Sequence, residues 1–515
     1  MNTRTVTEPR AARLLTRVLN RIEWAGNKLP HPFWLFVGLS ALLAVASALL
    51  DALDVSAAAP GGDGTIEARS LLSVEGIRGV VENAAANFTS FPPLATALLI
   101  MIGVSVADKT GLLSTALRAA VIRVPPKWVT FTLSFTAMVS HVASDAAYIV
   151  LIPLGAIVFR SVGRSPVLGI VVALVAISAG TDASPLITPT DVILSGLSTA
   201  AAQTLDPALV VSPVANYYFS LASSIVLSVV ITVVVEKFLA RRIEQGETDE
   251  GDLPAAEHEQ ALHLTPQERR GLQQAGWTAG VFILLITVAA LPPGSPLRGK
   301  NGAVVESPLI SGIAFLFMLL FLLAGAAYGR AVGAVRTSRD IPDHIAAGLK
   351  DLAPILVMFF AVSQFLAYFK WTHLGEIIAV KGSDLLRSAD THTLLIFAGL
   401  LVMVSLINLV VTSGSAQWSL VAPIFVPMLM LLDIPPQTTQ ALYRIADSCT
   451  NVVTPVSVYF VMALGFIQRH RRSAGIGTLA SMTIPLAACM FVVWTALFLL
   501  WWALGIPLGP GSPVR

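Results

Sequence analysis

The chain has 515 residues, of which 55% are hydrophobic and 12% are charged, and its mean hydropathy is +0.76. Soluble proteins carry about 25% charged residues, so this composition excludes a soluble globular fold and predicts an all-α polytopic membrane protein. The net charge of +2 gives no reason to expect nucleic acid as a partner. The two cysteines, Cys449 and Cys489, lie in apolar context and suggest neither a disulfide framework nor a zinc site.

Residues 1–32 form a basic segment without the apolar stretch of a cleavable signal peptide. By the positive-inside rule, we expect this segment to be a cytoplasmic tail. The expected location is the cytoplasmic (inner) membrane, with the N-terminus in the cytoplasm and lipids around the spans. The basic residues of the tail are Arg4, Arg10, Arg13, Arg17, Arg21 and Lys28.

The first half of the protein is predicted to cover residues 33–236. An apolar run at 33–52 is long enough to cross the membrane outward. The acidic, glycine-containing stretch 53–90 is predicted to be an external loop, and the run 92–117 returns. Segment 213–236 is the last crossing of this half.

Two segments of the first half are interrupted by polar residues. The run 128–160 has basic residues beyond both ends and the break SHVASD in the middle. A single crossing would violate the positive-inside rule, so we predict a re-entrant hairpin that opens to the cytoplasm. The following run, 166–200, crosses outward and is interrupted by GTDASPLITPTD, which predicts a broken helix.

A polar stretch at 237–272 is predicted to be a cytoplasmic linker to the second half, residues 273–515. The run 393–432 contains the break TSGSAQ and ends without a basic cluster, which predicts a second re-entrant hairpin, opening to the outside. A second broken helix is predicted at 438–468. The uninterrupted crossings of this half are predicted at 275–292, 308–329, 351–370 and 475–503. The whole chain therefore has about nine spans and two hairpins.

The two interrupted pairs resemble each other in sequence. SDAAYIVLIPLGAIVF (144–159) aligns with GSAQWSLVAPIFVPML (414–429), and TDASPLITP (181–189) aligns with DSCTNVVTP (447–455). Because the two hairpins open to opposite sides, we predict an inverted repeat. Such repeats are typical of secondary transporters, whose binding sites lie near the midplane at broken helices.

These segments also resemble motifs of the p-aminobenzoyl-glutamate transporter (AbgT) family. The most specific matches are TSGSAQWSLVAPIFVPMLMLL (412–432) and ALYRIADSCTNVVTP (441–455). The resemblance implies nine helices, two hairpins and a homodimer. It further implies transport of p-aminobenzoyl-glutamate or export of sulfonamide antimetabolites, driven by an ion gradient. Related divalent-anion symporters bind Na⁺ at their hairpin tips, so the resemblance leaves Na⁺ and H⁺ open as coupling ion, with no other cofactor.

The resemblance carries the family's functional positions onto this chain by motif. The residues assigned to substrate binding are Asn408, Ser415, Trp418, Pro436, Arg444 and Asp447. Asp191 and Pro455 are carried over in the same way and are assigned to ion or proton coupling. The residues themselves, without the resemblance, add Asp145, Ser184, Thr450, Asn451 and Thr454 to this set. The hydroxyl and amide oxygens of Ser184, Thr450 and Asn451 suit a hard cation, so Na⁺ is expected near Ser184, Ser415 and Asn451. The sequence departs from the family where a Ser-Ala-Asn-like word is usual, because it has Asp182-Ala183-Ser184 followed by Pro185, and His141 at the first hairpin tip is a further departure.

Each residue also has a structural interpretation. Arg444 and Asp447 are three residues apart and share a helix face, which suits either an ion pair or a substrate and ion site. Asp191 is either a helix cap or an ion-coupling carboxylate, or both. Trp418 either packs the hairpin or stacks on an aromatic substrate. For His141, a packing or hydrogen-bonding role at the hairpin tip is expected ahead of a role in proton transfer.

The sequence contains no ATP-binding or other enzymatic motif, so we expect an ion-driven transporter and not an enzyme. A second hypothesis is a Na⁺-coupled dicarboxylate or organic-anion symporter of the related fold. A channel or a non-transporting scaffold is a third, which two matched hairpins disfavour.

Overall fold

The computed structural model describes residues 31–515 except 59–63, 122–123, 144–145, 241–263 and 304–306. Most of the described chain is helical, and its strands form a short antiparallel ribbon of β1 (Ser56–Ala58) and β2 (Thr65–Glu67). The predicted all-α membrane fold is therefore confirmed. The basic tail residues and Asp145 lie outside the described residues.

Seven helical stretches of the described chain are long and apolar enough to cross a membrane. They are α2 (Pro32–Ala52), α3 (Val74–Thr89) continuing into α4 (Pro92–Lys109), α10 (Tyr217–Val234) continuing into η3 (Val235–Leu239), α13 (Pro266–Ala290), α15 (Ile313–Val332), α16 (Asp340–Trp371) and α22 (Ile476–Leu504). The two interrupted helices described below account for the remaining predicted spans.

The predicted external loop at 53–90 is wrong in its second part, where α3 forms after the cap residue Ser73. Charged residues such as Glu75, Arg78 and Glu82 interrupt the apolar residues of α3, so an apolar-run search misses it. The predicted span 92–117 ends early, at Lys109, and α5 (Leu112–Val121) follows the left-handed residue Gly111.

Two later boundaries also differ from the prediction. Helix α13 begins inside the predicted linker 237–272, at a capping box of Thr265 and Glu268. Helix α16 begins before the predicted span 351–370. The shorter elements outside the hairpins are η1 (Pro126–Trp128), η4 (Lys300–Gly302), α14 (Pro308–Ser311) and α17 (Leu374–Ser388).

Each predicted hairpin consists of two helices joined at its polar break. The first contains α6 (Val129–Val139), the tip η2 (Ser140–Ala143) and α7 (Ala146–Ser161), and the second contains α18 (Thr393–Asn408) and α19 (Gly414–Met430). Helix α6 has 11 residues and is about 16 Å long, about half of the hydrocarbon thickness. The chain therefore turns back at each polar break.

Both predicted broken helices are interrupted. Helix α8 (Pro166–Gly180) stops before the break and α9 (Pro189–Ala202) starts after it, with Thr188 as its N-cap. In the second half, α20 (Pro436–Asn451) and α21 (Val458–His470) flank the other break. That the two halves are related by inversion stays a prediction.

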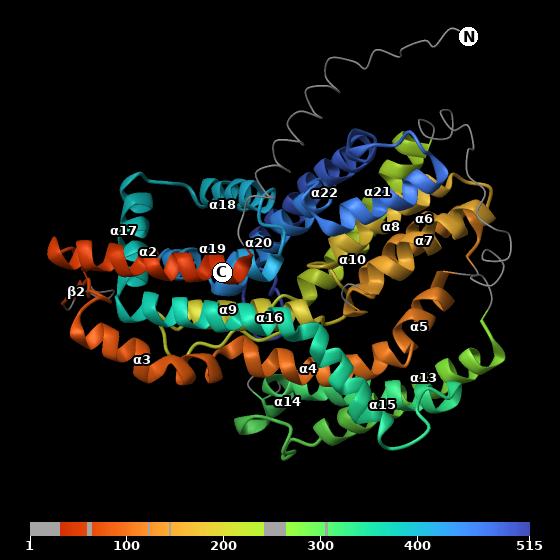
Figure 1. The fold of residues 1–515 in the computed structure, drawn as a ribbon, viewed down its shortest axis with the longest axis horizontal. Helices are drawn as coiled ribbons and strands as arrows, with labels where there is room; N and C mark the ends of the chain where they lie inside the picture. Colours follow the sequence, from red (N-terminus) through yellow and green to blue (C-terminus); the bar gives the residue numbers. More distant parts are fainter. Residues whose placement is uncertain (1–30, 59–63, 122–123, 144–145, 241–263, 304–306) are drawn as a thin grey trace, which may run out of the picture.

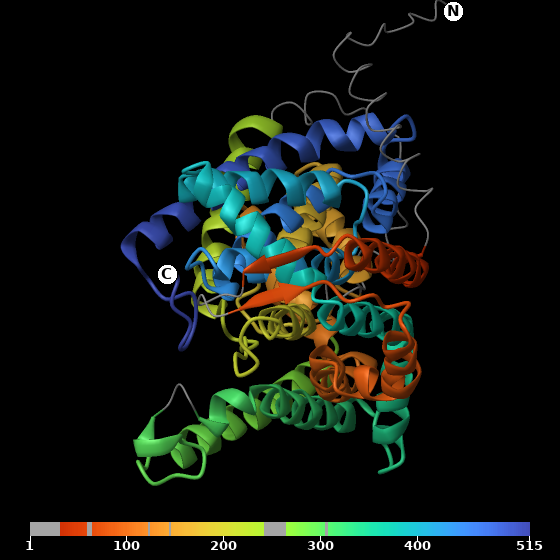
Figure 2. The same ribbon diagram turned by 90° about the vertical axis from the view of Figure 1, so that its left-hand side faces the viewer.

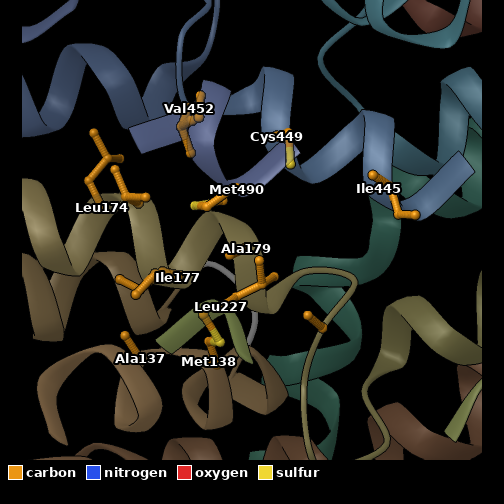
Figure 3. Packing of buried hydrophobic residues seen from close by; sticks show 14 of the residues in the cluster. Ala137, Met138, Leu174, Ile177, Ala179, Leu227, Ile445, Cys449, Val452 and Met490 are labelled. Carbon is orange, nitrogen blue, oxygen red and sulfur yellow. The ribbon is translucent and has the colours of Figure 1, made fainter. Parts of the chain in front are cut away.

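Helix α8 lies at the centre of the interrupted helices and packs against α6, α7, α20, α21 and α22. In Figure 3, Leu174 and Ile177 of α8 lie between Met138 of α6 and Val452 at the end of α20. A Cβ added to Gly169 would lie 2.1 Å from the carbonyl oxygen of Gly155 in α7, so these two backbones touch. This close packing joins the first hairpin to the first broken helix.

Some of the other long helices form a separate layer. Figures 1 and 2 show α4, α13 and α15 side by side, below the blue and gold helices of the hairpins and broken helices. We call α4, α13, α15 and α16 the scaffold, and α6–α9 with α18–α21 the core. Helix α16 packs along α4. The site described next lies within the core and at its border with the scaffold.

Candidate functional site

A buried ionic cluster joins the two broken helices. The Nη1 atom of Arg444, on α20, lies 2.6 Å from Oδ1 of Asp191, on α9, and 3.9 Å from Oδ1 of Asp182, in the first break. It also donates to the backbone oxygen of Asp182 at 3.4 Å. Arg444 is only 1% exposed. A charge this deep is tolerated because oppositely charged groups surround it.

Asp191 serves as both the helix cap and a charged partner. Its Oδ2 atom accepts hydrogen bonds from the backbone nitrogen and hydroxyl of Thr188, at 2.7 and 2.8 Å, which closes a capping box at the start of α9. Its Oδ1 atom accepts from Arg444. The carboxylate therefore ties the end of the first break to the second broken helix.

Asp182 and Asp447 form the other part of the cluster. Oδ2 of Asp182 accepts from Ser448 at 2.8 Å, and Oδ1 of Asp447 accepts from Asn451 at 3.0 Å. The two carboxyl groups are close enough to interact electrostatically. Within the described chain, no nitrogen or hydroxyl donor reaches Oδ1 of Asp182 or Oδ2 of Asp447.

The cluster contains three carboxylates and one guanidinium. With all of them ionised it has an excess of negative charge in a buried site, which favours uptake of a small cation. The expected pairing of Arg444 with Asp447 along their helix face is not what holds the arginine, because its close partner is Asp191. Sequence spacing shows that two residues share a face, whereas the rotamers and the neighbouring break decide the contact.

Asn408, Thr450 and Thr454 hold the second hairpin against the second break. Asn408 Nδ2 donates to the backbone oxygen of Asp447 at 2.7 Å and to the hydroxyl of Thr450 at 2.6 Å. Thr454, beside the buried Pro455, donates to the backbone oxygen of Leu409 at the hairpin tip, at 2.9 Å. The Oδ1 atom of Asn408 accepts no hydrogen bond from a described residue.

Trp418 packs the second hairpin onto α9. Its side chain is fully buried, and its Nε1 atom donates to the hydroxyl of Ser198 at 3.0 Å and the backbone oxygen of Leu194 at 3.2 Å. Its ring centroid lies 4.5 Å from that of Tyr443. In this conformation Trp418 has the packing role that the sequence left open.

A cavity of about 970 Å³ lies between α9, the N-terminus of α20 and the scaffold. Pro436 lines this cavity, which we call the α20-end cavity. A second cavity, of about 940 Å³, touches both hairpin tips and both breaks, and we call it the tip cavity. Ser415, Asn451 and His141 line the tip cavity, together with Tyr148, which stacks on Tyr459 at 3.8 Å.

The predicted site residues are therefore distributed over three places. Ser415 and Asn451 line the tip cavity, and Pro436 lines the α20-end cavity. Arg444, Asp447, Trp418 and Asn408 are buried and line neither cavity. Ser184 is also buried away from both cavities, and its hydroxyl accepts from the backbone nitrogen of Leu186 at 3.1 Å.

Sodium was expected near Ser184, Ser415 and Asn451, but only the last two share a cavity. Buried oxygen atoms that accept no hydrogen bond from any described residue lie instead on Asp182, Asn408 and Asp447, and Na⁺ prefers oxygen ligands. The sequence did not place Asp182 in the site. The sequence signal that could have identified Asp182 is that it places a carboxylate in the middle of an apolar span.

Comparison with known proteins identifies the family. The model of the AbgT putative transporter family matches residues 17–515, nearly the whole chain.

The chain belongs to the AbgT transporter family.

This AbgT protein is 38% identical over 493 residues to the p-aminobenzoyl-glutamate transport protein of Escherichia coli (strain K12), covering 95% of both chains. It is similar in structure to the Alcanivorax borkumensis YdaH transporter, with 37% identity, a TM-score of 0.89 and coverage of 93% of this chain and 100% of that one. Neisseria gonorrhoeae MtrF, described among antimetabolite efflux pumps, matches with 37% identity, a TM-score of 0.90 and coverage of 96% and 100%. These relatives confirm the expectation of a multi-pass membrane transporter that is not an enzyme.

Proposed function

We propose that this AbgT protein is an ion-gradient-driven transporter of p-aminobenzoyl-glutamate. The observation that carries the proposal is the tip cavity, which both hairpin tips and both breaks surround, the arrangement expected of a substrate site in a transporter with broken helices. The E. coli relative supports this substrate, and its identity of 38% extends over the whole fold.

Export of sulfonamide-type antimetabolites is a second candidate. The likeness to MtrF, with a TM-score of 0.90, favours it over the dicarboxylate symporter hypothesis. A p-aminobenzoyl ring and a sulfonamide share an aromatic amine, so the same stacked tyrosines in the cavity wall suit both compounds.

The coupling cation binds, in our proposal, between Asp182 and Asp447. The support is the excess of carboxylates over guanidinium in the cluster, together with its oxygens that accept no hydrogen bond from a nitrogen or hydroxyl of the described chain. Asp447 Oδ2 also points at the second hairpin tip, since a Cβ on Gly414 would lie 2.9 Å from it. A cation at this place would stabilise one position of the tip and so couple its binding to transport.

The movement that we propose is an elevator displacement of the core against the scaffold. The hairpins and broken helices share one continuous apolar core, which reaches the scaffold through Ala97 of α4 and Phe359 of α16. The other side of the scaffold has its own small cluster, which contains Ala107, Ala275 and Tyr328. A homodimer held through the scaffold, in the inner membrane with the N-terminus in the cytoplasm, completes the proposal.

The test is uptake of radiolabelled substrate into proteoliposomes under separately imposed Na⁺ and pH gradients. We expect accumulation of p-aminobenzoyl-glutamate with one gradient and none without a gradient. Equilibration without accumulation would indicate a channel. Accumulation of succinate but not of p-aminobenzoyl-glutamate would favour the dicarboxylate symporter.

A further inference from the structure

The scaffold wall of the tip cavity carries four charged side chains. Asp108 and Lys109 come from the end of α4, and Lys350 and Asp351 come from α16. The core side of the same cavity contributes hydroxyls, an amide, a histidine and the Tyr148–Tyr459 stack, but no lysine or arginine among its described lining residues. A cationic group for an anionic substrate must therefore come from the scaffold or from a rearranged core.

Arg444 is not available for that role in this conformation. Its guanidinium contacts Asp191 at 2.6 Å, is 1% exposed and does not line the cavity. Releasing it would leave a buried carboxylate without its partner, which is costly.

Of the two lysines on the scaffold wall, one is already neutralised. Lys109 Nζ lies 2.7 Å from Asp351 and 3.5 Å from Asp108. The ammonium of Lys350 has neither a hydrogen bond nor an ion pair with any residue that the structure describes, although Lys350 lines the cavity. It is therefore the available cation on the described wall.

We propose that Lys350 binds the glutamate side-chain carboxylate of the substrate at the scaffold side of the tip cavity, and so determines selectivity for diacids over monoacids. This inference depends on the proposed function. An ammonium group forms a charge-assisted hydrogen bond with a carboxylate and gains little from a neutral amide of the same size. Asp351 and Asp108 both pair with Lys109. Neither carboxylate neutralises the ammonium of Lys350, which therefore stays available to bind the ligand.

The experiment measures uptake kinetics in proteoliposomes for two probes of equal size, p-aminobenzoyl-glutamate and p-aminobenzoyl-glutamine. We expect Lys350→Gln to raise the KM for the diacid about ten- to hundredfold, which corresponds to the loss of one hydrogen bond to a charged group, and to change the KM for the amide less than about twofold. Lys350→Arg keeps the positive charge and should retain most of the affinity.

Lys381→Gln is the matched control, because Lys381 is an exposed lysine on α17 that lines neither cavity. The proposal is overturned if Lys350→Gln leaves the diacid KM unchanged, raises both KM values equally, or behaves like the control. A wild-type protein that accumulates neither probe would overturn the proposed function, and this inference with it. Melting temperatures of the purified variants separate a lost contact from a lost fold.

Discussion

The guanidinium of Arg444 and the carboxylate of Asp191 lie 2.6 Å apart, although 253 positions separate them in the chain. This contact connects the first broken helix to the second within the core. Because Asp191 also caps α9, a change in the position of Arg444 would act directly on the start of that helix. The ion pair is therefore both a structural link and a means of coupling the two breaks.

A double-mutant cycle on this pair tests how strongly the two broken helices depend on each other. We expect Arg444→Met to destabilise the protein by about 3–5 kcal/mol, because it leaves Asp191 buried without its cation. Adding Asp191→Asn should recover part of this loss, so that the double variant is more stable than the sum of the single effects predicts. Thermal unfolding of the purified protein measures the effect. Strict additivity would contradict the coupling.

Trp418 is expected to affect stability more than substrate affinity. Trp418→Phe removes the Nε1 hydrogen bonds to Ser198 and Leu194 and should cost about 1–3 kcal/mol. The KM for p-aminobenzoyl-glutamate should stay within about twofold, because the ring does not line the tip cavity. Uptake kinetics and melting temperature distinguish the roles. A large rise in KM at an unchanged melting temperature would show that the ring contacts the substrate.

Asp182 is expected to determine how many cations accompany the substrate. Asp182→Ser removes one of the three carboxylates around Arg444, so the cluster should take up fewer cations per transport cycle. The reversal of substrate flux under graded Na⁺ or pH gradients measures this ratio. The matched control is Asp384→Ser, at an exposed position on α17 away from both cavities, which should leave the ratio unchanged. An unchanged ratio in Asp182→Ser would exclude this carboxylate from coupling.

The close contact of α7 with α8 predicts that a methyl group at Gly169 disrupts folding, whereas a methyl group at Gly399, outside this contact, does not. Gly169→Ala places a methyl group 2.1 Å from the backbone oxygen of Gly155, so the helices must separate and the yield of folded protein should fall. Gly399→Ala, on α18, meets no atom within 4 Å and should leave the yield unchanged. Size-exclusion chromatography of both variants in detergent makes the comparison. Normal folding of Gly169→Ala would show that the two helices are not tightly packed.

Local patterns in the sequence were sufficient to find the hairpins and the breaks. A short polar segment within an apolar run, such as SHVASD or TSGSAQ, marks where a helix is interrupted. A proline after the interruption marks where the next helix starts. Patterns were insufficient for α3, whose charged residues interrupt its apolar face, and for the start of α13.

The sequence by itself determined the membrane class, the family and the positions of the interrupted helices, because hydropathy, charge and proline act over short distances along the chain. Only the tertiary structure decided the partners of Arg444, the packing role of Trp418 and the membership of Asp182 in the ionic cluster. Those contacts join helices that lie far apart in the sequence. Their geometry depends on how the two breaks pack around α8, which no local pattern contains.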